Sequence, residues 1–459
     1  MIRTPLGDRL REIAEKDRLR LHMPGHKGRG GVLMPYDITE IPGADNLHDP
    51  QDVIAESQQM IAACYGAKAS RLLVGGTTAG ILAVLLAGAG PEGRVLIPTN
   101  AHRSVFAALH IGRLTGHFID PVFETFPRFP KVVTVETVEK ALDQDPDIQG
   151  MILTSPTYYG TASDVAAIAA ALHRRGKWLA VDEAHGAHLA FWHGGPPSAV
   201  ACGADAAVSS THKILGAPTM GSVLLMNSAR IDIEKVDDWL SQIESSSPSY
   251  LLMAGIEKAV AEGAEQSEGV FETVGAAHDR AVPLFSHPEH RLFLYGGPPE
   301  TYDRSKWLFG VRDGSGFELA KTLRERFGLY FEIETPDTLL AMTGIGTTAA
   351  DLDAFIAAMQ SVDGETNIQP APALADLPAG RFNQTLPFWQ AVDQPRTPCP
   401  LAKAAGRIAG QMLIPYPPGV PLALPGDRLT PETVGMLAEM DAQGLEIMGV
   451  EDGRIQIIK

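Results

Sequence analysis

The length, composition and charge of the chain exclude several classes of protein. With 459 residues, of which 45% are hydrophobic and 20% charged, the chain can bury a large core and a second, smaller domain, and it lacks the composition of a disordered polypeptide. The formal net charge of −17 argues against nucleic-acid binding through a general positive field.

The cysteines and the apolar runs set further limits. Cys64, Cys202 and Cys399 are far apart and form no Cys-x-x-Cys pair, which argues against a disulfide scaffold and against a structural zinc site. The charged N-terminus lacks the apolar core of a signal peptide, and the longest apolar run, residues 79–89, is too short to span a bilayer. We therefore expect a cytoplasmic protein with no metal site, no membrane contact and no nucleic-acid partner.

The first fifty residues are expected to form a helix and then a loop. Residues 5–20 have the pattern of a charged amphipathic helix. Residues 22–50 are too rich in Gly, Pro, His and Asp to form a core element. We predict that residues 1–50 form an N-terminal helix with an active-site loop, and that a further helix follows over residues 51–65.

Residues 51–285 are predicted to form a large α/β domain. Short apolar runs alternate there with helical patterns, which is typical of a mostly parallel sheet covered by helices on both faces. The expected strands are residues 94–97, 148–154, 177–181, 206–210 and 222–226, and the expected helices are residues 102–114 and 163–174.

The pattern changes after residue 285, where we expect a smaller α+β domain. Its expected strands are residues 291–295, 306–311 and 338–343, and its expected helices are residues 316–327 and 349–360. Residues 286–363 would form the first part of this domain, the Pro- and Ala-rich run 364–380 a linker, and residues 381–459 its C-terminal part.

The large domain places the residue types that pyridoxal phosphate needs at predicted strand ends. This cofactor needs a lysine for a Schiff base, an acid against its ring nitrogen, donors for its phosphate and a flat group on its ring. Lys213, Asp182 and His102 each follow a predicted strand, and the Gly-Gly-Thr-Thr turn at residues 75–78 opens an apolar helix. Each feature alone is common, but strand ends converge in an open α/β sheet, so together they predict a site for the cofactor.

Nine motifs resemble those of the ornithine/lysine/arginine decarboxylase family, the group III decarboxylases, in its short form. They are HMPGHKG at 22–28, PGADNLHDP at 42–50, GTT at 76–78, NAHRS at 100–104, SPTYYG at 155–160, DEAHG at 182–186, STHK at 210–213, SSSPSY at 245–250 and PYPPG at 415–419. The resemblance implies a fold-type-I, aspartate-aminotransferase-like architecture with pyridoxal 5'-phosphate as cofactor. It also implies decarboxylation of arginine, lysine or ornithine to the amine and carbon dioxide, in polyamine biosynthesis.

The resemblance further implies roles for single residues. Lys213 would carry the cofactor, Asp182 would pair with the ring nitrogen, and His102 would stack on the ring. His185 would lie near the ring hydroxyl or the substrate, and His102 or Lys213 would deliver the proton to the product. The residues that would hold the phosphate are Gly76, Thr77, Thr78, Ala79, Ser210 and His212. The fold implies a homodimer with active sites at the subunit interface.

The residues leave the substrate and two other functions open. A basic amino acid needs a partner for its distal cation, and no spacing selects among Glu40, Asp45, Asp49, Glu244 and Asp427. An aminotransferase or carbon–sulfur lyase of the same fold type is also consistent with Lys213 and Asp182. So is a non-catalytic regulatory protein of this fold, because a fold alone does not define a function.

Overall fold

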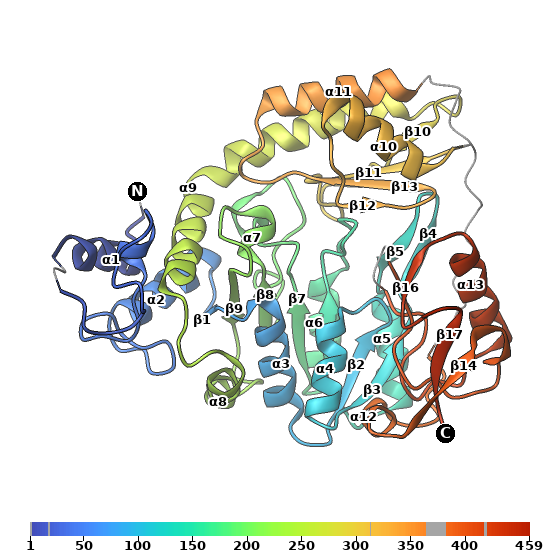
Figure 1. Ribbon diagram of the computed structural model, residues 1–459, viewed down its shortest axis with the longest axis horizontal. Helices are drawn as coiled ribbons and strands as arrows, with labels where there is room; N and C mark the ends of the chain where they lie inside the picture. Colours follow the sequence, from blue (N-terminus) through green and yellow to red (C-terminus); the bar gives the residue numbers. More distant parts are fainter. Residues whose placement is uncertain (1, 17–18, 313, 364–381, 417–419) are drawn as a thin grey trace.

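A computed structural model shows a large central sheet, a smaller sheet above one end of it and a C-terminal unit at its side (Figure 1). The structure describes residues 2–16, 19–312, 314–363, 382–416 and 420–459. Among these residues, no helix has both the length and the apolar character needed to cross a bilayer.

The large sheet has seven strands in the order β1-β9-β8-β7-β6-β2-β3. They are β1 (Ala69–Leu73), β2 (Arg94–Pro98), β3 (Thr115–Ile119), β6 (Ile148–Thr154), β7 (Trp178–Asp182), β8 (Ala206–Ser209) and β9 (Ser222–Met226). Strand β9 runs antiparallel to β1 and β8, and the other neighbouring pairs are parallel. The predicted mostly parallel sheet is therefore confirmed.

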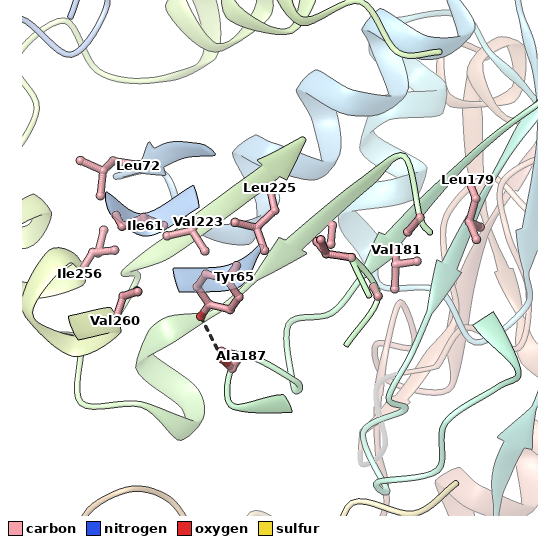
Figure 2. Packing of buried hydrophobic residues seen from close by; sticks show 14 of the residues in the cluster. Ile61, Tyr65, Leu72, Leu179, Val181, Ala187, Val223, Leu225, Ile256 and Val260 are labelled. Carbon is pink, nitrogen blue, oxygen red and sulfur yellow. Dashed lines mark hydrogen bonds between the residues drawn. The ribbon is translucent and has the colours of Figure 1, made fainter. Parts of the chain in front are cut away.

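Helices cover both faces of this sheet because side chains alternate along its strands. On one face lie α3 (Gly76–Ala89), α4 (Arg103–Ile111) and α8 (Ile233–Ile243), and on the other lie α2 (Val53–Tyr65), α5 (Val135–Gln144), α6 (Val165–His173) and α9 (Tyr250–Ala281). In β7, Ala180 packs with the first group, whereas Leu179 and Val181 pack with the second. Figure 2 shows this second core, where the Tyr65 hydroxyl donates to the Ala187 carbonyl at 2.9 Å.

Helix α9, with 32 residues, joins the two sheets and was not predicted from the sequence. Its N-terminal half packs on the large sheet and its C-terminal half packs in the core of the small sheet. Glycines interrupt its apolar pattern, but they serve close packing: a Cβ on Gly255 would lie 2.5 Å from Pro218, and one on Gly275 would lie 3.1 Å from Trp192. The close approach of other segments to these glycines cannot be predicted from the periodicity of the sequence.

The small sheet has the antiparallel order β10-β11-β13-β12. Its strands are β10 (Leu292–Leu294), β11 (Lys306–Val311), β12 (Ile333–Glu334) and β13 (Thr338–Met342), covered by α10 (Gly316–Phe327) and α11 (Ala349–Asp363). The remaining N-terminal and connecting elements are α1 (Pro5–Lys16), η1 (Met34–Tyr36), β4 (Val122–Thr125), β5 (Arg128–Val132), η2 (Leu189–Phe191), α7 (Thr211–Ile214) and η3 (Val282–Phe285). The predicted strands and helices of this region are all present.

The C-terminal segment has a hydrophobic cluster of its own. Its elements are α12 (Phe388–Val392), β14 (Arg396–Pro400), η4 (Leu401–Lys403), β15 (Ile414–Tyr416), α13 (Pro431–Ala442), β16 (Glu446–Met448) and β17 (Arg454–Ile458). Phe388 of α12 joins the core around α4 of the large domain. The proposed linker 364–380 lies outside the described residues, so the division of residues 286–459 stays a prediction.

Candidate active site

Lys213 lies on α7, the single helical turn after β8, on the side of the large sheet that faces the small sheet (Figure 1). Its Nζ is 2.9 Å from Nε2 of His185, which follows β7. Burial lowers the pKa of Lys213, and the carboxylates of Asp182 and Glu332 oppose this effect. A lowered pKa favours the free amine, which is the nucleophilic form, more than in an exposed lysine.

His185 is buried and neutral. Burial lowers the pKa of its ring well below the usual value, and the positive charges of Lys213 and Lys306 lower it further. The ring packs on Tyr158 with 4.4 Å between ring centroids. A neutral ring can accept a hydrogen bond at Nε2 from the Lys213 ammonium, so His185 can orient the lysine nitrogen.

Asp182 and His102 complete the group at the carboxyl edge of the sheet. Asp182 ends β7, is buried, and accepts the Ala184 N–H at 3.1 Å. His102 precedes α4, where Nδ1 accepts the Ser104 N–H at 3.3 Å and so orients the ring. Nearby protein atoms partly desolvate the His102 ring, which lowers its pKa. The Asp182 carboxylate raises this pKa, whereas the Lys213 ammonium lowers it further. The structure thus brings together the lysine, the acid and the imidazole predicted from the sequence.

Three hydroxyls converge at the N-terminus of α3. The Thr77 hydroxyl is hydrogen-bonded to that of Ser210 and lies 3.0 Å from that of Ser222. Gly76 adopts φ +74°, a left-handed conformation that favours glycine, and so opens the helix beside these hydroxyls. A helix N-terminus with several hydroxyl donors fits a phosphate group. Ser222 was missed because only its strand, and not its neighbours across the sheet, was apparent in the sequence.

The other predicted phosphate residues lie around the same point. Thr78 and Ala79 are in the first turn of α3, where the buried Ala79 offers only its backbone N–H. His212 Nδ1 lies 2.9 Å from the Gly221 carbonyl oxygen, so this ring is tied to the loop before β9. Its predicted contact with phosphate remains a prediction.

Three of the carboxylates considered for substrate recognition accept hydrogen bonds that stabilise the fold. Asp45 accepts the backbone N–H groups of Gln51 and Asp52, each at 2.9 Å, at the start of α2. Asp427 is buried in the C-terminal segment and accepts from Gln384 at 3.0 Å. Glu244 accepts backbone N–H groups of the turn before α3.

Glu332 was not predicted from the sequence, but it interacts with residues of the site. It is exposed, precedes β12 and accepts a hydrogen bond from the hydroxyl of Tyr158. Its charge also acts on Lys213. No motif marks Glu332, because it reaches the site through the packing of the small sheet over the large one.

The sheet order and this constellation define a fold-type-I enzyme, the class that contains aspartate-aminotransferase-like proteins. The family model for the major domain of Orn/Lys/Arg decarboxylases matches residues 4–280, and that for their C-terminal domain matches residues 374–448. The chain belongs to the ornithine/lysine/arginine decarboxylase family.

Individual relatives agree with this assignment over almost the whole chain. An arginine decarboxylase of Bacillus subtilis is 28% identical over 99% of this chain and 97% of its own length. An uncharacterised protein of the same organism, YaaO, is 32% identical over 97% of this chain and 96% of its own. The crystal structure of the lysine decarboxylase LdcF of Francisella novicida superposes with a TM-score of 0.84 at 18% identity, covering 99% of this chain and 81% of that one, which shows a shared fold.

Proposed function

We propose that this protein decarboxylates a basic amino acid, arginine, lysine or ornithine, to the corresponding amine and carbon dioxide with pyridoxal 5'-phosphate as cofactor. The observation that carries the proposal is the convergence of Lys213, His185, Asp182 and His102 beside the hydroxyl-lined start of α3. Family membership supports the reaction type.

The residues present fit the cofactor. Ser210, Thr77 and Ser222, with the first N–H groups of α3, would hold the phosphate. Asp182 would pair with the ring nitrogen and His102 would cover one face. When bound, the cofactor supplies an electron-accepting ring for the electron pair left by the departing carboxylate.

The protein side chains supply the nucleophile and the proton. Lys213 Nζ, whose pKa is lowered by burial, is the attacking amine. Nε2 of His185, 2.9 Å away, can accept a hydrogen bond from this nitrogen and so orient it. Lys213 or His102 would protonate the carbon from which carbon dioxide has left, as general acid.

The distal cation of a basic substrate requires a carboxylate near the mouth of the site. Glu332 meets this requirement, because it is exposed and its charge reaches Lys213. Glu332→Gln is expected to raise KM roughly tenfold or more, since an ion pair is replaced by a neutral contact. An unchanged KM in steady-state assays would reject this role.

The test of the function is release of carbon dioxide and amine by the purified protein with added pyridoxal phosphate. Arginine, lysine and ornithine are supplied separately, with Lys213→Ala as the inactive control. Release from one substrate supports the proposal and identifies that substrate. A keto acid product, or cofactor binding without turnover of any of the three, would favour an aminotransferase or a non-catalytic protein.

We further propose a cytoplasmic homodimer whose active sites lie at the subunit interface. The N-terminal segment carries exposed apolar side chains at Leu19, Leu21, Met23 and Val32, and such a group is typical of a surface covered by another chain. Light scattering gives the mass directly. A monomer that retains full activity would contradict the interface site.

A further inference from the structure

A buried charged cluster joins the large sheet to the small sheet. It consists of Lys306, Asp303 and His188, whose side chains have no exposed surface. His188 Nε2 is 3.2 Å from Asp303 Oδ1, and Lys306 Nζ is 3.9 Å from Asp303 Oδ2. His188 follows β7 of the large sheet, whereas Asp303 and Lys306 stand at the start of β11, so the cluster links the two domains.

The backbone holds the lysine against the active-site turn. The Asp303 N–H donates to the Gly160 carbonyl at 2.8 Å, and the Lys306 N–H donates to the Asp303 carbonyl at 3.1 Å. The stem of Lys306 fills the space beside Gly160, because a Cβ there would lie 2.8 Å from Lys306 Cγ. Gly160 ends the turn that carries Tyr158, and the Tyr158 ring packs on His185.

The ammonium of Lys306 has no hydrogen-bond partner among the described residues. A buried cation without a close partner is costly, and in this low-dielectric surrounding its charge acts on neighbouring groups. The charged groups that act on it are Asp303, Lys213 and Glu332. Its own charge acts on His185, together with the charges of Lys213, His102 and His212.

Lys306 keeps its charge at neutral pH. Burial lowers its pKa to about 8; Asp303 opposes this, Lys213 lowers the value further, and Glu332 opposes again. When Lys213 is not an ammonium, the repulsion from it disappears and Lys306 holds its proton to higher pH. A positive charge then remains that acts on the Lys213 nitrogen and the His185 ring.

We propose that Lys306 is a positioning residue: its buried ammonium, which lies beside Asp303 and against the turn at Gly160, opposes protonation of His185 and of the Lys213 nitrogen when that nitrogen carries the cofactor. The proposal rests on the proposed function, because it assigns Lys306 a task at the same site. The consequence is a Lys213 nitrogen that can accept a proton from the incoming substrate ammonium at neutral pH.

The test is a pH titration of the absorbance of the imine between Lys213 and pyridoxal phosphate, without substrate. Lys306→Met is expected to raise the pH midpoint of this titration by about one unit, because a nearby cation is lost. Lys306→Arg, which keeps the charge, should return the midpoint toward that of the native protein. Should the Met variant fail to fold, Lys306→Gln, with a polar end, takes its place. A midpoint that is unchanged or lowered in the uncharged variants overturns the proposal.

Two further variants separate charge from packing. Ser305→Ala removes a buried hydroxyl next to Lys306 without changing any charge, and its midpoint should equal that of the native protein. Glu332→Gln removes a negative charge that acts on Lys213, so its midpoint should fall. A shift in Ser305→Ala as large as that in Lys306→Met would show that packing is responsible and would reject the role of the charge.

If the native protein forms no imine at all, the proposed function fails and this inference fails with it. If the native protein forms the imine but the midpoint is unshifted in the uncharged variants, only the inference is overturned.

Discussion

The carboxylate of Glu244 accepts the backbone N–H of Gly75 at 2.8 Å and thereby holds the turn in front of α3. The same carboxylate accepts the Val74 N–H at 3.1 Å. Burial raises the pKa of Glu244 to about 7, and these two hydrogen bonds act against the rise. The proposed phosphate site thus depends on an acid that titrates near neutral pH.

Glu244→Ala is expected to lower the free energy of unfolding by about 1.5–3 kcal/mol, because two buried backbone donors lose a charged acceptor. Glu244→Gln should lose less, since an amide oxygen remains. The folded pKa lies above the unfolded value of about 4.3, so protonation stabilises the native protein at low pH and this contribution is lost as pH rises to 7. The stability of the Gln variant relative to the native protein should therefore increase between about pH 4 and about pH 7 in urea unfolding. A constant difference would contradict the raised pKa.

Ser210→Ala is expected to weaken binding of pyridoxal phosphate roughly tenfold, because one hydroxyl donor to the phosphate is removed. Ser209→Ala is the matched control: its hydroxyl donates to Glu183 at 3.2 Å instead of joining the Thr77 group. Fluorescence titration of the cofactor-free proteins gives both dissociation constants. Equal affinities for the two variants would show that the hydroxyls of Ser210, Thr77 and Ser222 do not form the phosphate site.

Much of the large domain and the centre of its site could be predicted because the determinants are local. Asp182 ends strand β7, Lys213 and His102 follow shortly after β8 and β2, and parallel strands end at the same edge. Glu332 and Lys306 could not be predicted, since they belong to the small sheet and reach the site only through tertiary packing. Asp427 was considered for the substrate because it is acidic, but it accepts the Leu424 N–H at 2.7 Å inside the C-terminal segment.

Gly150→Ala is expected to destabilise the large sheet strongly. A Cβ at Gly150 would lie 2.0 Å from the Trp178 indole, which is fixed by its hydrogen bond to the Gly88 carbonyl at 2.9 Å. Overpacking of a buried site costs about 1–3 kcal/mol or more. Gly435→Ala, in α13 with no atom within 4 Å of the new Cβ, should instead be neutral or stabilise by about 0.5–1 kcal/mol. Thermal unfolding distinguishes the two, and equal melting temperatures would contradict this packing.

Asp205 determines part of the resistance to acid. It is buried before β8 and accepts hydrogen bonds from the Leu179 N–H and from His173, each at 2.8 Å, and from Ser228. Burial alone would raise its pKa, but the bonds from Ser228, Leu179 and His173 prevail and leave the pKa lowered.

Because the folded pKa of Asp205 lies below the unfolded value of about 3.9, its contribution to stability is present above that pH and is lost as the pH falls through the folded pKa. Asp205→Asn should therefore lower the free energy of unfolding by about 3 kcal/mol at neutral pH and flatten its decline in acid. The control is Asp237→Asn, which breaks a half-exposed pair with Arg71 at 2.6 Å and should cost less than about 1 kcal/mol. Urea unfolding from about pH 3 to about pH 7 measures both variants. If Asp205→Asn retained the native acid dependence, the lowered pKa would have no part in it, and the His173 contact would be structural only.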